Sequence, residues 1–320
     1  MKMKKKSRNQ IIRKKTDLLE KRKIWIDGRS IPFKNAQVSI LSHSFARGSA
    51  IFEVMSAYHP EKGVAIFRLS EHLDRLMHSA DALMMKIPLS RAQIKQAIFQ
   101  TLKANKVDHG LVKVIAFYPG FGLEVIPTDP KVSVAVAAFQ FERDFKLSKF
   151  GEDRFATAGI SKWRKMDPAT VPVYAKASGN YLNPMLAKLE IRSRGFKTPI
   201  LLDTQGYVAE GATESIFIVK NNRIYTPSLD NILPSITRLS ILEICHHLGI
   251  PVQEKKLKPQ DLFTCDEAFF SSTTCKVWPI SKIEKHQLPA PGPLSQRLKD
   301  YFDQILAGKI KKFQSWLNFP

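Results

Sequence analysis

Cysteine is scarce in this chain, and long apolar runs are absent. Of the 320 residues only Cys245, Cys265 and Cys275 are cysteines, and no two of them form a CxxC pair. We therefore expect no disulfide framework and no metal site, and so few thiols suit a reducing compartment. No stretch approaches the roughly 18 uninterrupted apolar residues of a membrane helix, and the basic first residues do not suit a secretory signal. A cytoplasmic protein without a membrane partner is expected.

Acidic residues are also few, since 29 Asp and Glu stand against 50 Lys and Arg, which gives a formal net charge of +21. Residues 1–23 carry +9 of this charge and the rest of the chain carries +12. Clustered Lys and Arg side chains release counterions when they bind phosphate. The excess of basic residues therefore makes nucleic acid a candidate partner. Because residues 1–23 show no apolar period, we expect a disordered basic tail, the only region expected to contact nucleic acid.

The length and a hydrophobic fraction of 44% are sufficient for two folded domains. The first half predicts an α+β unit in which a sheet is covered by two helices. One helix is expected over 71–85, and a capping-box pattern at Ser90 and Gln93 opens the other. The apolar stripe of the first helix comprises Leu73, Leu76, Met77, Ala80, Leu83 and Met84. Strands are predicted at 24–26, 36–40, 50–58, 112–119 and 132–141.

The second half predicts a β-rich unit with fewer helices. A helix that ends at Gly195 is followed by hairpins that turn at 204–206 and at Asn221-Asn222. The stripe predicted to bury that helix consists of Leu182, Met185, Leu186 and Leu189. The apolar pattern lapses over 162–171, which we interpret as the interdomain connection. The expected division is a tail at 1–23, a small domain at 24–160, a linker at 161–172, a large domain at 173–310 and an extension at 311–320.

Lys176 and Glu210 have the residue types that one kind of chemistry requires. Lys176 lies between small residues in AKASG, just before a helix. A lysine that attacks an aldehyde needs a lowered pKa, which burial beside another cation supplies. Glu210 follows the first hairpin, and a buried carboxylate beside a pyridine nitrogen keeps that nitrogen protonated. Taken singly, each residue would be interpreted as a solvated surface side chain.

An anion site is predicted where a helix begins at Ser235, Ile236 and Thr237, because free amides and the helix dipole attract negative charge there. The hydroxyl cluster at 271–274 follows an apolar segment and offers further donors. Arg75 lies off the apolar stripe of its helix, so it is free to reach a phosphate.

Five segments identify a family resemblance. They are HLDRL (72–76), YAKASGNYL (174–182), YVAEGATESIF (207–217), LPSITR (233–238) and FFSSTT (269–274). In order and spacing they resemble the fold type IV pyridoxal-phosphate enzymes, which include branched-chain aminotransferases, D-amino acid aminotransferases and aminodeoxychorismate lyases. The resemblance implies pyridoxal 5′-phosphate as the cofactor. It also implies an α+β fold with a smaller N-terminal α/β sandwich and a larger, β-rich pseudo-barrel domain.

The resemblance further implies a role for each matched residue. Lys176 becomes the Schiff-base lysine and proton carrier, Glu210 the partner of the pyridine nitrogen, and Tyr181 the partner of the ring 3-oxygen. The implied phosphate ligands are Arg75, Ile236, Thr237 and Thr273. The implied substrate contacts are Phe52, Arg47, Lys113 and Thr274. Members of the family are dimers, and the loop at 43–48 would border the active site at the dimer interface.

The substrate pattern departs from that of branched-chain aminotransferases, which usually have FEGxR where this chain reads FEVMS at 52–56. Leu111 and Lys113 replace a tyrosine and an arginine that hold substrate carboxylates, and Lys113 offers only a point charge. The leading prediction is a homodimeric aminotransferase acting on branched-chain L-amino acids and 2-oxo acids. A D-amino acid aminotransferase and an aminodeoxychorismate lyase are alternatives on the same fold. A basic nucleic-acid-binding protein is the non-enzymatic alternative.

Overall fold

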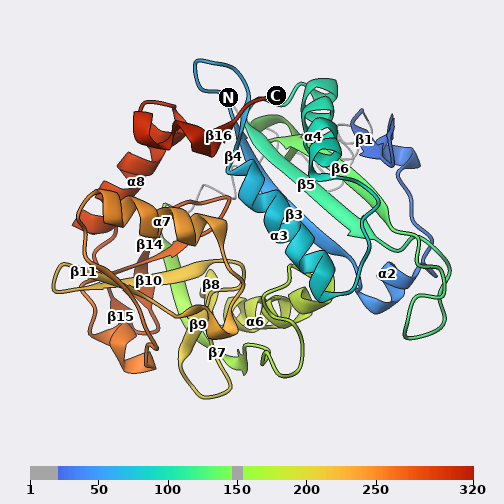
Figure 1. The fold of residues 1–320 in the computed structure, drawn as a ribbon. Helices are drawn as coiled ribbons and strands as arrows, with labels where there is room; N and C mark the ends of the chain where they lie inside the picture. The colour runs from blue at the N-terminus through green and yellow to red at the C-terminus, as the bar shows by residue number, and fades with distance from the viewer. Residues whose placement is uncertain (1–20, 146–153) are drawn as a thin grey trace, which may run out of the picture.

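The computed structural model describes residues 21–145 and 154–320. It is built around two β-sheets, of seven and nine strands, with helices packed on them (Figure 1), which confirms the α+β expectation. Residues 1–20 of the predicted basic tail lie outside the described residues. Within the described ranges, no helix combines the length and apolar character needed to cross a membrane.

The strands are β1 (Lys23–Ile26), β2 (Arg29–Pro32), β3 (Ile51–Tyr58), β4 (Ala65–Phe67), β5 (Gly110–Phe117), β6 (Ser133–Gln140), β7 (Ala156–Arg164), β8 (Thr198–Leu202), β9 (Val208–Glu210), β10 (Ser215–Lys220), β11 (Arg223–Thr226), β12 (Val252–Glu254), β13 (Glu267–Ser271), β14 (Trp278–Ile283), β15 (His286–Gln287) and β16 (Leu317–Asn318). The α-helices are α2 (His43–Arg47), α3 (Leu69–Ala82), α4 (Arg91–Asn105), α6 (Leu182–Ser193), α7 (Ile236–His247) and α8 (Pro293–Leu306). Short 3-10 or π segments are η1 (Phe33–Asn35), η2 (Phe141–Phe145), η3 (Ser178–Tyr181), η4 (Leu229–Asn231), η5 (Pro259–Phe263) and η6 (Lys311–Trp316).

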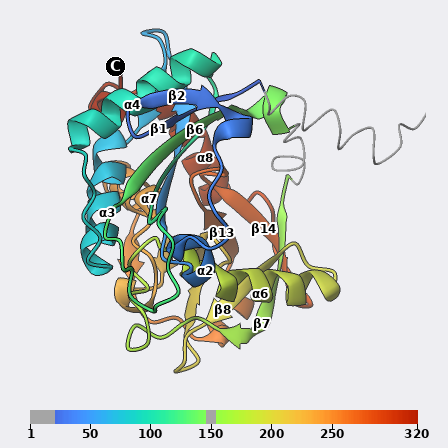
Figure 2. The ribbon, with the colours of Figure 1, turned by 90° about the vertical axis from the view of Figure 1, so that its right-hand side faces the viewer.

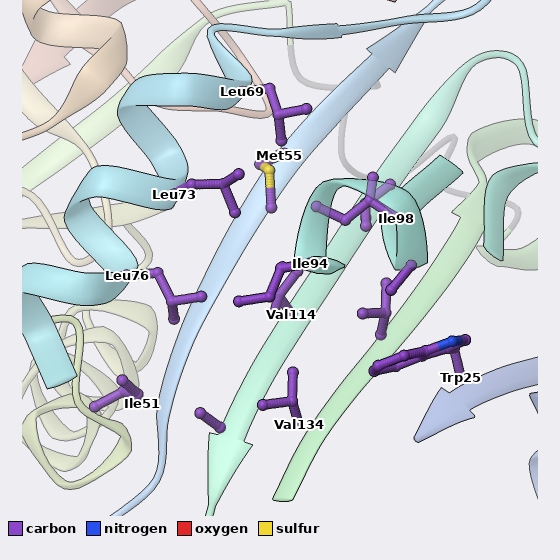
Figure 3. Packing of buried hydrophobic residues seen from close by; sticks show 14 of the residues in the cluster. Trp25, Ile51, Met55, Leu69, Leu73, Leu76, Ile94, Ile98, Val114 and Val134 are labelled. Carbon is purple, nitrogen blue, oxygen red and sulfur yellow. The ribbon is translucent and has the colours of Figure 1, made fainter. Parts of the chain in front are cut away.

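The first sheet has the order β16-β4-β3-β5-β6-β1-β2, and every neighbouring pair is antiparallel. Helices α3 and α4 pack on it, as the sequence predicted. Leu73 and Leu76 of α3 and Ile98 of α4 point toward Met55 and Val114 of the strands (Figure 3). The capping box at Ser90 and Gln93 is present and begins α4, so this part of the prediction is confirmed.

Two expectations for the first half are wrong. No strand forms at 36–40, where Val38 and Ile40 are exposed, because alternating apolar residues make a strand only where a neighbouring strand accepts their hydrogen bonds. Met84 does not belong to the buried stripe of α3 and is 89% exposed. The helix ends at Ala82 and Met84 takes a left-handed backbone with φ of 51°, which turns its side chain away from the core.

The second sheet has the order β12-β11-β10-β13-β14-β7-β8-β9, and its ninth strand, β15, pairs with β14 off this path. Val208 of the last strand bridges to Leu257, three residues beyond the first strand in this order, so the two ends of the sheet meet. This contact closes the sheet into the expected pseudo-barrel. Asn221 and Asn222 both have positive φ at the β10–β11 turn, as the two-residue hairpin prediction requires.

The division into domains stays a prediction, but one local expectation is wrong. Residues 161–164, expected to be linker, are the end of β7, which pairs with β8 and β14 inside the second sheet. The sequence did not indicate a strand here, because Lys162, Trp163 and Arg164 at its end are all exposed and break the apolar alternation.

The stripe predicted to bury α6 is also wrong. Leu182, Met185 and Leu189 are 59%, 50% and 57% exposed. The buried face carries Pro184, Ala187 and Ile191 instead, and it packs on β7 and β8. The helix lies with this face against the sheet, so Leu182, Met185 and Leu189 on its opposite face point outward.

The end of the chain returns to the first sheet instead of extending from the second. Residues 317–318 form β16, which pairs with β4. The Arg68 guanidinium lies over the Trp316 ring, 4.4 Å from its centroid, and donates to Ser240 Oγ on α7 at 3.1 Å. Arg68 and the C-terminal segment therefore hold α7 beside α3, and the two helices meet at the pocket described below.

Candidate active site

A pocket lies where the two sheets meet. Elements from both halves of the chain contribute to it, among them α3, the segment before η3, β9 and the loop after β13. Its chemically active lining residues are Arg75, Lys165, Lys176, Tyr181, Glu210 and Thr273. Five of these six were predicted from the sequence, so the fold brings the predicted cofactor residues together.

Lys176 is fixed by its backbone to two elements of the first half of the chain. Its amide donates to Ser79 Oγ on α3 at 3.0 Å, and its carbonyl accepts from the Phe52 amide on β3 at 3.0 Å. The Lys176 side chain then crosses the pocket, and Nζ donates to Tyr181 Oη at 2.7 Å. Lys176 therefore has a defined position without an ion-pair partner at hydrogen-bond distance among the described residues.

Burial lowers the pKa of Lys176 to about 7, and the nearby charges of Arg75 and Lys113 add to this shift. Burial also raises the pKa of Tyr181, so this phenol stays protonated. A large fraction of Lys176 is thus a neutral amine near neutral pH, which is the nucleophilic form.

The rate at which the apoprotein captures pyridoxal 5′-phosphate is expected to depend on pH with a midpoint near 7, because only neutral Lys176 attacks the aldehyde. The rate should fall as pH drops through 7, since protonation removes the lone pair. Stopped-flow absorbance measures it. Pyridoxine 5′-phosphate, which lacks the aldehyde, is the control and should show no such step. A midpoint near the ordinary lysine value of 10.5 would contradict the assigned environment.

Arg75 is held by a buried carboxylate that the sequence analysis did not single out. Glu53 is fully buried and accepts from Arg75 Nε and Nη2, each at 2.7 Å, and from His72 Nδ1 at 2.7 Å. Burial alone would raise the pKa of Glu53, but the charge of Arg75 and the hydrogen bonds from Arg75 and His72 lower it to about 2. Arg75 Nη1 reaches the Pro234 carbonyl at 2.8 Å. The guanidinium is thereby fixed beside the start of α7.

The N-terminus of α7 forms the rest of the predicted anion site. Ser235 caps the helix by accepting from the Arg238 amide at 3.2 Å, and the first intrahelical bond runs from the Leu239 amide to the Ser235 carbonyl. The amides of Ile236 and Thr237 come before that bond and have no intrahelical acceptor. The Ile236 side chain is buried, so only its backbone can serve a ligand. Arg75 and this helix end therefore favour an anion at one side of the pocket.

Glu210 lies at the end of β9 and is paired with a lysine that the sequence analysis missed. Lys165 Nζ lies 2.6 Å from Glu210 Oε1, and both side chains are nearly buried. Next to them, a Cβ on Gly211 would lie 2.8 Å from Glu214 Oε2, so this glycine leaves room for a neighbouring carboxylate.

None of the four predicted substrate residues lines the pocket, but Phe52 and Lys113 lie close to Lys176. The Phe52 ring lies 4.9 Å from the Tyr181 ring, and the Nζ atoms of Lys176 and Lys113 lie 5.0 and 4.7 Å from its centroid. Burial lowers the pKa of Lys113. Arg47 is exposed and donates to the Leu123 carbonyl, and it is not part of the pocket wall.

Thr274 likewise lies outside the pocket wall, and its hydroxyl is 3.2 Å from Ser272 Oγ. Of the implied phosphate ligands, Thr273 lines the pocket, whereas Thr237 lines a smaller adjoining hollow that it shares with Thr273. The implied roles of these residues stay predictions.

The residues of the pocket fit the cofactor that the resemblance implies. Lys176 offers an amine to an aldehyde, Tyr181 a hydroxyl, and Glu210 a carboxylate to a ring nitrogen. Arg75 and the start of α7 suit a phosphate. Every one of these groups is buried or half-buried in one hollow, so pyridoxal 5′-phosphate matches the donor set of this site.

Comparisons with known proteins agree with this site. The family model described as amino-transferase class IV matches residues 50–283. A branched-chain-amino-acid aminotransferase of Pseudomonas aeruginosa is 34% identical over 300 residues, which are 92% of this chain and 95% of the relative. The crystal structure of a branched-chain aminotransferase from Thermoproteus uzoniensis with norvaline has a TM-score of 0.88 and 33% identity, and the match covers 93% of this chain and 98% of that one. The branched-chain amino acid aminotransferase from Thermobaculum terrenum in its PLP-form, the holo-form, has a TM-score of 0.85 and 28% identity, and the match covers 93% of this chain and 97% of that one.

Proposed function

Because this chain belongs to the class IV aminotransferase family and is thus a pyridoxal-phosphate-dependent transferase, we propose that it moves amino groups between branched-chain L-amino acids and 2-oxo acids. One observation carries the proposal. Lys176 Nζ lies in the same pocket as Glu210, and it is hydrogen-bonded to Tyr181 at 2.7 Å. The choice of substrate is supported by the similar proteins, which bear the name branched-chain aminotransferase.

When bound, pyridoxal 5′-phosphate supplies an electron sink that makes the α-proton of an amino acid acidic. Lys176 is the base for that proton, since its pKa of about 7 lets it accept a proton from the substrate Cα and give it up again near neutral pH. Tyr181 Oη, hydrogen-bonded to Nζ, orients the amine within the pocket. Phe52 covers Lys176 and limits the access of water to it.

The remaining roles belong to Glu210, Arg75 and Lys113. Glu210 holds a proton on the ring nitrogen, and Arg75 with the α7 amides binds the phosphate. Lys113 offers its charge to the substrate carboxylate, since its Nζ and that of Lys176 both lie near the Phe52 ring. The roles of Thr273 and Thr274 as hydroxyl donors to phosphate and substrate are part of the same proposal.

A panel of amino donors tests the substrate assignment. We expect L-leucine, L-isoleucine or L-valine to convert the bound cofactor fastest, and their D isomers to react at least about 100-fold more slowly, because one face of a chiral substrate presents its α-proton to Lys176. Absorbance of the cofactor and formation of the 2-oxo acid measure the rates. The fastest turnover with a D-amino acid would contradict the assignment, and so would 4-aminobenzoate formation without 2-oxo acid turnover, which would indicate the lyase alternative.

We also propose that the working enzyme is a homodimer in the cytoplasm. The proposed interface is the face on which α2 and α6 lie (Figure 2), where Gly48 at the end of α2 bonds to Gly179 before α6. Large apolar side chains gather on these elements and on the loop after β5, and exposed apolar patches of this kind suit a protein partner. The supporting residues are Phe45, Phe121, Leu123, Val125, Ile126, Leu182, Met185 and Leu189. Three free cysteines suit a reducing compartment.

A further inference from the structure

The ion pair between Lys165 and Glu210 has no part in the roles given so far. Lys165 Nζ lies 2.6 Å from Glu210 Oε1, and the two side chains are 8% and 11% exposed. Both residues line the pocket that holds Lys176. A buried ion pair costs much desolvation free energy, so a position on the wall of an active site calls for a functional explanation.

The two partners are held by the same strand. The Lys165 amide, directly after β7, donates to the Leu202 carbonyl on β8 at 2.8 Å. Glu210, at the end of β9, is the Cα partner of Leu201 on the other side of β8. Three hydrogen-bonded strands thus fix both ends of the ion pair, and the Glu210 carboxylate cannot turn away without breaking the contact with Lys165.

A carboxylate has two oxygens, and the contact with Lys165 engages Oε1. A fixed cation at one oxygen holds the carboxylate in place and leaves the other oxygen to face a ligand in the pocket. Without the Lys165 ammonium, the buried Glu210 carboxylate would have no counter-charge whenever no ligand is bound. Its burial would then cost more free energy.

We propose that Lys165 is a positioning residue that holds the Glu210 carboxylate correctly oriented toward the ring nitrogen of pyridoxal 5′-phosphate. This role rests on the proposed function, because it requires Glu210 to face that nitrogen. Lys165 is paired with Glu210 and acts through that carboxylate.

Cofactor affinity of the full chain tests the proposal. Lys165→Met is expected to weaken binding of pyridoxal 5′-phosphate by about 10- to 100-fold, whereas Lys165→Arg, which keeps the charge, should stay within about threefold of wild type. Lys162→Met is the matched control, since it removes an exposed lysine of β7, and it should leave affinity unchanged. The dissociation constant is measured from the absorbance of the bound cofactor. Wild-type affinity in Lys165→Met would overturn the role, and so would a Lys165→Arg protein as weak as Lys165→Met.

A double-mutant cycle separates positioning from simple structural support. If Lys165 acts through Glu210, adding Lys165→Met to Glu210→Gln should weaken cofactor binding by less than about threefold more, since the target of the lysine is already lost. Additive losses would overturn the proposal. If Lys165→Met alone does not fold, the double variant should fold, because it leaves no unpaired buried charge. A double variant that also fails to fold would overturn the proposal by showing a structural role.

Failure of this role can be distinguished from failure of the proposed function. A wild-type protein that does not bind pyridoxal 5′-phosphate would refute the proposed function itself. A wild-type protein that binds it, together with a Lys165→Met variant that binds it equally well, would refute only the role of Lys165.

Discussion

Lys176→Ala is expected to lower kcat for transamination by at least about 10⁴-fold, because it removes both the amine that anchors the cofactor and the base for the substrate α-proton. Lys165, the other lysine that lines the pocket, is paired with Glu210. Tyr181 is hydrogen-bonded to Nζ, but burial raises its pKa, so it is a poor base. Steady-state formation of the 2-oxo acid from L-leucine measures the loss.

Two further measurements test whether the loss of activity in Lys176→Ala is due to the missing amine. Lys86→Ala, at an exposed lysine that is not part of the pocket lining, should retain wild-type turnover. Added methylamine should restore part of the activity of Lys176→Ala, because a small amine can occupy the space of the lost side chain and accept a proton. Turnover of Lys176→Ala within about tenfold of wild type would refute Lys176 as the catalytic base.

Glu53→Gln is expected to destabilise the protein by about 3 kcal/mol, because it leaves the buried Arg75 guanidinium without its counter-charge. The wild-type carboxylate accepts two bonds from Arg75 and one from His72. The pKa of Glu53 is lowered to about 2, so this contribution to stability is fully present above the ordinary glutamate value of 4.5 and is lost as pH falls toward 2. Urea unfolding of the apoprotein at neutral pH measures the difference.

Glu61→Gln provides the matched control for Glu53→Gln. Glu61 is an exposed carboxylate in the turn between β3 and β4, and its substitution should change the free energy of unfolding by less than about 0.5 kcal/mol. If Glu53→Gln were equally mild, the neutral amide would be an adequate partner for Arg75, and the buried charge would not be what stabilises the pair.

Much of the site could be predicted because its residues lie in short, continuous motifs. Lys176 with Tyr181, and Glu210 on a strand after a hairpin, each belong to one segment whose local structure follows from nearby residues. The start of α7 was recognised from Ser235, since an N-cap is a local property of the chain. That these residues are buried in one pocket could be seen only from the fold, whereas their chemistry could be predicted from the residue types and motifs.

The residues that were missed owe their roles to contacts between distant segments. Glu53 lies on β3 and meets Arg75 of α3, and Lys165 after β7 meets Glu210 across β8. Packing of α3 on the sheet places the first pair and strand register places the second, and the sequence has no local sign of either. The wrong stripe on α6 has the same origin, because periodicity finds an apolar face without saying whether the core or a partner covers it.

By itself the sequence determined the chemistry, since Lys176, Tyr181 and Glu210 occur in motifs that suit one cofactor. It also determined most helices and hairpins, which depend on caps, turns and periods within a few residues. Only the tertiary structure decided what surrounds those groups. Burial lowers the pKa of Lys176, and Glu53 fixes Arg75 beside α7. These are effects of distance and exclusion of water, and both arise only when segments far apart in the chain are packed together.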